Sequence, residues 1–177
     1  MPRVLVDANV LFPTVLRGIV TGLAARGLLR LFWSARILEE WARAAGRAGP
    51  AQEAVARGEI ALLRARFPGA EVAVPPGLEA RLWLPDPADV HVLAAAIAGG
   101  CGVLLTQNAR DFPRAALAAE GIVRRAPDEL LLALPAEAVA AVAQAELGQL
   151  RALSGADWSL RQMLRKAGLP RLARALG

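Results

Sequence analysis

The chain has 177 residues and a net charge of +5, and it contains one cysteine and one histidine. This length predicts one domain, or one domain with a modest appendage, and allows a substantial core. The single cysteine and single histidine exclude an intrachain disulfide and zinc sites built from these two residue types. If the chain performs hydrolytic chemistry, we therefore expect carboxylates to carry it.

The chain is expected to be cytoplasmic and free of membrane spans. A thiol-poor chain suits a reducing compartment. No stretch of about 20 uninterrupted apolar residues predicts a transmembrane helix, and no basic and then apolar leader predicts a signal peptide. All but one of the 21 basic residues are arginine. Basic domains often bind nucleic acid, although an arginine- and alanine-rich composition can also reflect the base composition of a genome.

The first half of the chain predicts strands that alternate with helices. Residues 3–6 are apolar and typical of a buried strand, which ends at Asp7. Ser34 can cap the helix that follows the second strand. After residues 3–6 the sequence predicts a helix at 10–26, a strand at 28–34, helices at 35–45 and 51–67, and a strand at 71–74.

The segment that begins at Asp86 carries strong helix signals. Asp86 can cap the helix, Pro87 occupies its first position, and Asp89 lies in its first turn. Gly99 and Gly100 end this helix. The sequence then predicts a buried strand at 102–106, a short helix at 113–120 and a short strand at 121–125.

Alternating strands and helices predict an α/β fold with a parallel sheet and helices on both faces. Beyond Pro127 only helical patterns remain, so we predict one domain over residues 1–126 and a helical extension over 127–177. In parallel sheets, ligands bind outside the carboxyl ends of the strands. Asp7 and the turn that holds Asp111 both follow such ends.

Several acidic side chains fall where a common site could form at that edge. Hard divalent cations such as Mg²⁺ and Mn²⁺ prefer oxygen ligands, and clustered carboxylates repel one another unless a cation neutralises them. Each acid alone has a structural explanation, because Asp86 can cap a helix and Glu40 can be a solvated helix residue. The prediction of a metal site therefore rests on the whole set. Its members are Asp7, Glu39, Glu40, Asp86, Asp89 and Asp111.

Other noticeable residues are given structural roles. His91 is expected to be a packed or surface histidine, and Cys101 a small packing residue. The tryptophans are expected in the core or in an interface. They are Trp33, Trp41, Trp83 and Trp158.

Four motifs occur in order over residues 3 to about 125, namely "VLVDANVL", "ILEEW", "LPDPADVHVLAAAI" and "VLLTQNARDFP". Together they resemble a PIN domain, and more narrowly the VapC-like toxin ribonucleases of bacterial toxin–antitoxin pairs. The resemblance implies a Rossmann-like sheet and a carboxylate-held Mg²⁺ or Mn²⁺ centre. The segment "ADWSLRQMLRKAGLPRLARAL" is similar, less specifically, to the carboxyl-terminal helices of a subgroup of these proteins.

By this resemblance, the catalytic and metal-binding acids are Asp7, Glu40, Asp89 and Asp111. Glu40 matches the family pattern better than Glu39, because the family acid precedes an aliphatic or aromatic residue. For the third acid, Asp86 and Asp89 remain alternatives. Asp89 is preferred, and Asp86 would then be a capping neighbour. The polar residues expected to support these acids are Asn9, Asp86, Thr106 and Asn108.

The resemblance further implies an endoribonuclease that hydrolyses RNA phosphodiester bonds and leaves 5′-phosphate ends, as the toxin of a toxin–antitoxin pair. It also implies a homodimer and a cognate antitoxin that covers the site. Arginine side chains would hold the RNA backbone, and binding would weaken as salt rises. The arginines expected to do so are Arg17, Arg26, Arg30 and Arg110.

Three other functions remain open on the sequence. A phosphatase of the haloacid-dehalogenase type also has an aspartate after its first strand, but it has a second aspartate two residues later, where this chain has Asn9. A catalytically silent PIN module would only bind RNA or a protein partner, although all four acids are present. A DNA or flap nuclease could use the same centre, but such chains usually carry large insertions.

Overall fold

A five-stranded parallel sheet forms the centre of the molecule, in a computed structural model that describes all 177 residues. The strand order is β3-β2-β1-β4-β5, and every neighbouring pair is parallel. The predicted α/β fold is therefore confirmed. The strands are β1 (Arg3–Val6), β2 (Arg30–Ser34), β3 (Glu71–Val72), β4 (Val103–Leu105) and β5 (Val123–Arg125).

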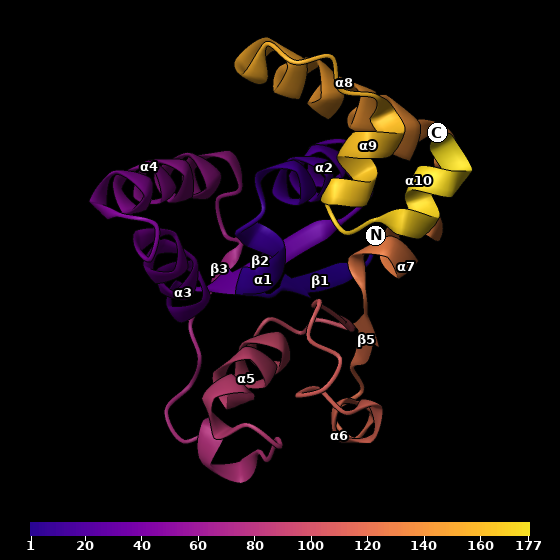
Figure 1. Cartoon of the computed structure of the whole chain (residues 1–177). Helices are drawn as coiled ribbons and strands as arrows, with labels where there is room; N and C mark the ends of the chain where they lie inside the picture. The colour runs from indigo at the N-terminus through magenta and orange to yellow at the C-terminus, as the bar shows by residue number, and fades with distance from the viewer.

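Helices cover both faces of this sheet (Figure 1). The helices α2 and α4 lie on one side and α5 and α6 on the other, as right-handed crossovers between parallel strands require. Two short 3₁₀ turns, η1 (Glu79–Arg81) and η2 (Pro87–Asp89), precede α5. The helices up to β5 are α1 (Ala8–Leu11), α2 (Thr14–Ala25), α3 (Ala35–Gly46), α4 (Pro50–Arg66), α5 (Val90–Ala98) and α6 (Arg114–Ala118).

The single helix predicted over residues 10–26 is wrong, because the chain forms two helices there. Pro13 has extended backbone angles (φ −72°, ψ 122°) and separates α1 from α2. Proline has no N–H to continue the hydrogen bonds of α1, so the helix ends at this point. The helix α1 also starts earlier than predicted, directly after Asp7, whose side chain caps it.

The core lies between the sheet and its helices. Val4, Leu5 and Val6 are fully buried, because β1 is the central strand and is covered on both faces. Trp33 of β2 is also fully buried and meets Phe67 edge to face, with 6.1 Å between the ring centroids. The chain therefore leaves its best-packed strand at Asp7.

Four further helices follow β5. They are α7 (Pro127–Leu132), α8 (Ala136–Ser154), α9 (Leu160–Lys166) and α10 (Pro170–Leu176). The helix α8 packs along α2, and glycines of α2 allow the close approach. A Cβ atom at Gly22 would lie 2.7 Å from Val142 Cγ1, and one at Gly18 would collide with the carboxylate of Glu146. Whether residues 1–126 and 127–177 fold separately stays a prediction.

Asp128 connects α7 to α10. It is 8% exposed, and its carboxylate accepts hydrogen bonds from the backbone N of Arg171 and of Leu172, each at 2.8 Å. A carboxylate at a helix N-terminus satisfies free N–H groups and interacts favourably with the helix dipole. Asp128 thus acts as a cap supplied from more than 40 residues away in the sequence.

We expect Asp128→Ala to lower the free energy of unfolding by about 2 kcal/mol, because two N–H groups of α10 would lose a charged acceptor. Urea denaturation measures this change. The matched control is Asp157→Ala, because the Asp157 side chain is fully exposed and lies 3.6 Å from Arg151. Equal effects of the two substitutions would contradict the assigned cap.

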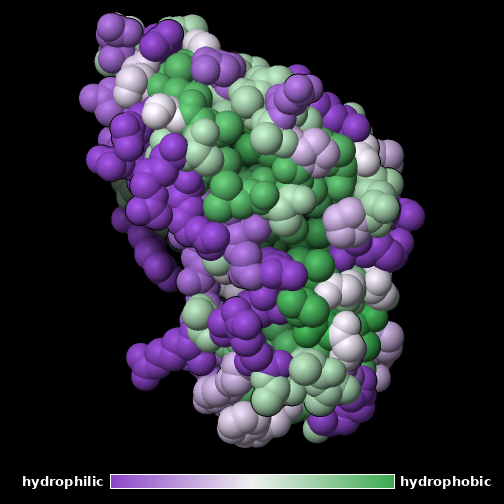
Figure 2. Space-filling view, turned by 90° about the vertical axis from the view of Figure 1, so that its right-hand side faces the viewer, coloured by the Kyte–Doolittle hydropathy of each residue, from purple (hydrophilic) through white to green (hydrophobic).

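Figure 2 shows the face on which α7, α10 and β5 lie. Hydrophobic residues form a band that runs down the middle of this face, and hydrophilic residues lie mainly along its left side. Apolar side chains of α9 and α10 are largely used inside the fold, since Met163, Leu164 and Leu172 are buried. None of the helices is both long enough and apolar enough to span a membrane.

Candidate metal centre

Acidic and polar side chains meet at the carboxyl edge of the sheet, between β1 and β4. Within the sheet, β2 and β3 lie on one side of β1. The chain then returns to form β4 on the opposite side of β1. Such a reversal leaves a crevice outside the carboxyl ends of the two central strands. Asp7 directly follows β1, and Thr106 directly follows β4.

Hydrogen bonds fix Asp7 at this edge. Its Oδ1 accepts from the backbone N of Ala8 at 2.7 Å, and its Oδ2 accepts from the Thr106 hydroxyl at 2.7 Å and from Asn9 Nδ2 at 3.0 Å. Burial raises the pKa of Asp7, and the bonds from Thr106 and Ala8 counteract this rise. The side chain is 7% exposed, so its orientation is set by the fold rather than by solvent.

The turn after β4 links Asp7 to Asp111. Asn9 Nδ2 also donates to Thr106 Oγ1 at 3.1 Å, and Thr106 Oγ1 accepts from the backbone N of Asn108 at 3.0 Å. Asn108 Nδ2 in turn donates to Asp111 Oδ2 at 2.9 Å. The predicted supporting residues Asn9, Thr106 and Asn108 therefore lie in one hydrogen-bond network between the two acids.

Three aspartates form the most compact acidic cluster. Carboxylate oxygens of Asp86, Asp89 and Asp111 lie within 4.8 Å of one another. Asp86 Oδ1 accepts from the backbone N of Ala88 at 2.9 Å, so Asp86 caps η2 as its sequence position predicts. Asp89 makes no capping bond of this kind, which leaves its carboxylate free to bind a ligand.

The pKa of Asp89 reports the charge around it. Burial raises this pKa to about 6, and negative charge from Asp7, Asp86, Asp111 and Glu40 adds to the rise. Five carboxylates therefore share one electrostatic environment, although they come from four different parts of the chain. Proteins place like charges this close mainly where a cation is to be bound or a proton is to be exchanged.

Glu40 faces His91, the only histidine. Nε2 of His91 lies 2.6 Å from Glu40 Oε1, and neither ring nitrogen of His91 has a hydrogen-bond partner. His91 is 2% exposed, so this buried polar ring is aimed at the acidic centre without a good partner of its own. From the sequence alone we expected only a packing or surface role for His91. The available signal was its position two residues after Asp89.

Arginine pairs distinguish Glu39 from Glu40. Glu39 forms ion pairs with Arg43 at 3.1 Å and with Arg57 at 2.9 Å, on the exposed surface. No arginine or lysine lies within ion-pair distance of the acids of the centre. Most other glutamates of the chain are paired with arginine, whereas Glu40 and the aspartates of the centre are not.

The donor set fits a hard divalent cation. The ligands on offer are carboxylate oxygens, with no thiolate and with a single imidazole that already faces Glu40. Such oxygen sets suit Mg²⁺ and Mn²⁺, which also retain bound waters. The only thiol, Cys101, is buried at the amino end of β4, and burial raises its pKa to about 11. Cys101 is therefore unsuited to act as a thiolate nucleophile.

The predicted RNA-binding arginines lie in different places. Arg110 is exposed, precedes Asp111 and belongs to the rim of the centre. Arg26 ends α2 and Arg30 begins β2, so both lie at the amino edge of the sheet, opposite the acids. Arg17 is 9% exposed and is held by contacts inside the protein. The structure therefore brings only Arg110 close to the carboxylates.

Arg17 contacts three helices. Its Nη1 donates to the carbonyl oxygens of Leu11 at 2.5 Å and Phe12 at 3.1 Å, its Nη2 donates to Glu59, and its guanidinium lies 4.5 Å from the Trp41 ring centroid. These contacts join the end of α1 to α3 and α4. The Nη1 and Nη2 groups of Arg17 therefore donate to groups inside the protein, and not to the phosphate of an RNA.

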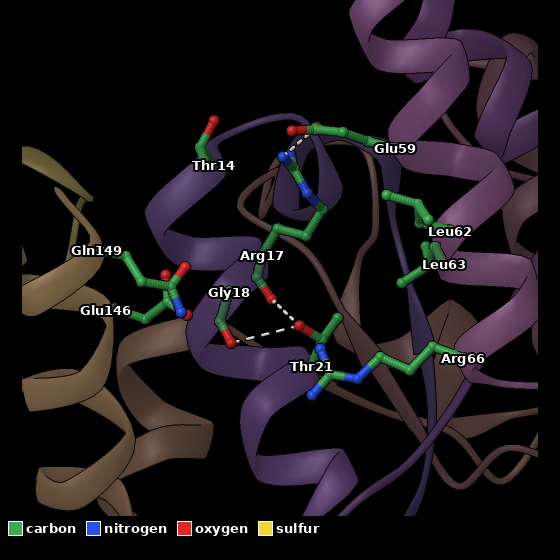
Figure 3. Close-up of a pocket in the computed structure, with 10 residues that line it drawn as sticks. All are labelled: Thr14, Arg17, Gly18, Thr21, Glu59, Leu62, Leu63, Arg66, Glu146 and Gln149. Carbon is green, nitrogen blue, oxygen red and sulfur yellow. Dashed lines mark hydrogen bonds and ion pairs between the residues drawn. The ribbon is translucent and has the colours of Figure 1, made fainter. Parts of the chain in front are cut away.

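Figure 3 shows the hollow on α2 that Arg17 borders, between α4 and α8. Its volume is about 340 Å³, and Glu146 reaches it from α8. Burial raises the pKa of Glu146, and Arg17 and Arg66 counteract this rise. The hollow contains none of the acids of the metal centre, so it is a separate feature.

Comparison with known families gives one match. A family model described as a PIN domain matches residues 3–110, which is more than half of the chain and includes Asp7, Glu40 and Asp89. No curated protein and no solved structure matches the chain significantly.

Proposed function

The chain belongs to the PIN-domain family, and from this premise we propose that it is a divalent-metal-dependent endoribonuclease. Members of this family are in general metal-dependent nucleases. One observation carries the proposal to this chain. Five carboxylates gather at the carboxyl edge of the sheet without an arginine or lysine partner, in a protein whose other glutamates are mostly paired with arginine.

Asp7, Asp89, Asp111 and Glu40 would hold Mg²⁺ or Mn²⁺, and Asp86 would cap η2 beside them. A divalent cation in this place lowers the pKa of a bound water and polarises a phosphoryl oxygen. The protein needs no nucleophilic side chain of its own for such hydrolysis. This agrees with a buried Cys101 whose pKa is raised to about 11.

The remaining polar residues position the acids. Thr106 and Asn9 orient Asp7, and Asn108 orients Asp111 through the bonds described above. His91 restricts Glu40 from the buried side. Residues of this kind hold ligands in place before the ion and the substrate arrive, which reduces the reorganisation that binding requires.

The finer assignments follow the resemblance to VapC-like toxins. The substrate is RNA, and the protein acts in the cytoplasm as the toxin of a toxin–antitoxin pair, as a homodimer and under the control of a cognate antitoxin. Arg110 contributes to phosphate binding beside the centre. Residues 1–126 form the nuclease domain, and residues 127–177 form its helical extension.

Cleavage of labelled RNA by the purified protein tests the proposal. We expect cutting with Mg²⁺ or Mn²⁺, no cutting with a chelator, and no cutting by Asp7→Asn, because Asp7 would lose its charge while keeping its shape. Glu39→Gln is the matched control, since Glu39 neighbours Glu40 but is used in ion pairs with arginines. It should cut at the wild-type rate.

Two results would count against the proposal. Cleavage that survives both the chelator and Asp7→Asn would point to a contaminating nuclease. An inert wild-type protein that still binds RNA in a salt-dependent manner would favour the catalytically silent module.

A further inference from the structure

Trp83 is exposed, unlike the other tryptophans of the chain. Its exposed fraction is 71%, compared with 0% for Trp33 and 2% for Trp41, and Trp158 packs against the core. We expected each tryptophan to lie in the core or in an interface, and in the single chain Trp83 does not lie in the core. A lone exposed apolar residue is common in proteins, so its position must decide what it does.

Trp83 lies three residues before Asp86, which belongs to the acidic cluster. Leu82 is partly buried and Leu84 is 2% exposed, so side chains alternate and Trp83 faces outward. Pro85 and Asp86 follow, and Asp86 caps η2. Three residues of extended chain span at most about 11 Å, which is the largest distance between the Cα atoms of Trp83 and Asp86.

Two arginines lie near the segment that holds Trp83. Arg110 is exposed, makes no ion pair and precedes Asp111, whose carboxylate belongs to the cluster with Asp86. Arg36, at the start of α3, lies 3.9 Å from Glu79 of η1, and its side chain is 56% exposed. An aromatic ring and weakly engaged cations next to a centre that cuts phosphodiesters form the combination that binds single-stranded nucleic acid.

We propose that Trp83 is a stacking site for an unpaired RNA base beside the phosphate that is cut. The inference rests on the proposed ribonuclease function and adds the residue that would hold an unpaired base beside the centre. A base inside a duplex has both faces covered by its neighbours, so it offers no face to the indole. Stacking does not read base edges, so Trp83 selects unpaired RNA and not a sequence.

The test measures RNA binding apart from cleavage. All variants carry Asp7→Asn, so that RNA is bound but not cut. Fluorescence anisotropy reports binding of an unstructured oligoribonucleotide of about 12 nucleotides and of the same strand paired with its complement. Leu62→Ala is the matched control, since Leu62 is 72% exposed but lies on α4, away from the acids.

Trp83→Ala should weaken binding of the single strand by about 5- to 150-fold, which is the range for one stacked base. Trp83→Phe should restore most of this loss, and Leu62→Ala should change nothing. Binding of the duplex should be insensitive to Trp83. The salt dependence of binding should also stay the same in Trp83→Ala, because stacking releases no counterions, whereas Arg110→Gln should reduce it.

Binding of the single strand by Trp83→Ala at the wild-type level would overturn the inference, as would an equal loss for the duplex. Cleavage by the protein without the Asp7 change separates the two proposals. A protein that cuts RNA regardless of Trp83 refutes only the stacking site. A protein that binds single strands through Trp83 and does not cut refutes only the nuclease, and one that binds no RNA refutes both.

Discussion

Asp89→Asn is expected to reduce metal-dependent cleavage by about 100-fold or more and, at the same time, to stabilise the metal-free protein. The loss of activity follows from the loss of a charged ligand. The gain in stability follows from the environment of Asp89, because burial, and then the negative charges of Asp7, Asp86, Asp111 and Glu40, oppose its ionisation. The substitution removes no capping bond, since the Asp89 side chain makes none.

The pH dependence of this gain has a definite sign. Asp89 has a pKa of about 6 in the folded protein, above its ordinary value of 3.8. Between these values the folded protein holds a proton that the unfolded chain releases, so the wild type loses stability as pH rises toward about 6. The advantage of Asp89→Asn should therefore be absent below about pH 4 and complete near pH 7. Because Asp89 is partly exposed, we expect about 1 kcal/mol.

Thermal unfolding with chelator and with Mg²⁺ measures both effects. Mg²⁺ should raise the Tm of the wild type by mass action and have less effect on Asp89→Asn. Asp157→Asn is a suitable control, because Asp157 is exposed and distant from the cluster in sequence. If chelated Asp89→Asn melts below the wild type at neutral pH, the repulsion we infer is absent.

Arg17→Met is expected to lower the free energy of unfolding by about 3 kcal/mol. Methionine keeps the apolar stem but leaves the carbonyl oxygens of Leu11 and Phe12 without their donor, and it removes the contact of the guanidinium with Trp41. Because those carbonyls end α1, whose first turn is capped by Asp7, cleavage should also fall. Urea denaturation gives the stability change.

Arg110→Gln provides the contrast. Arg110 is exposed and has no ion pair, so its loss should leave stability unchanged while it weakens RNA binding and its salt dependence. If Arg17→Met instead kept full stability and reduced the salt dependence of RNA binding, Arg17 would contact phosphate as the sequence alone suggested.

Local patterns were sufficient to predict most of the fold. Apolar runs at residues 3–6 and 102–106 became the two central strands, and the signals at Asp86 and Pro87 marked the entry to α5. The break at Pro13 was misjudged, because a proline near a helix start is also tolerated there. The strand order could not be predicted, since it depends on contacts between distant segments.

The sequence was sufficient to predict which acids form the candidate centre. It was not sufficient to predict which side chains surround each acid. Sequence alone could not separate Glu39 from Glu40 by charge, because the arginine partner Arg57 lies 18 residues away on another helix. Nor could it show that His91 faces Glu40, since a histidine on an apolar helix is more often a packing residue. The burial of Arg17 was hidden for the same reason, because each of its partners belongs to a different helix.

The close packing of α8 on α2 has a consequence for synthesis. Gly18 and Gly22 of α2 are matched to side chains of α8, and about 110 residues separate the two helices in the chain. At about 5–20 residues per second, the ribosome makes α8 roughly 5 to 20 seconds after α2. During that interval the sheet and the acid-bearing segments are already made, while the outer surface of α2 is still uncovered. Nascent chains therefore pass through a stage in which they carry every acid of the centre while the surface of α2 that α8 later covers is still exposed.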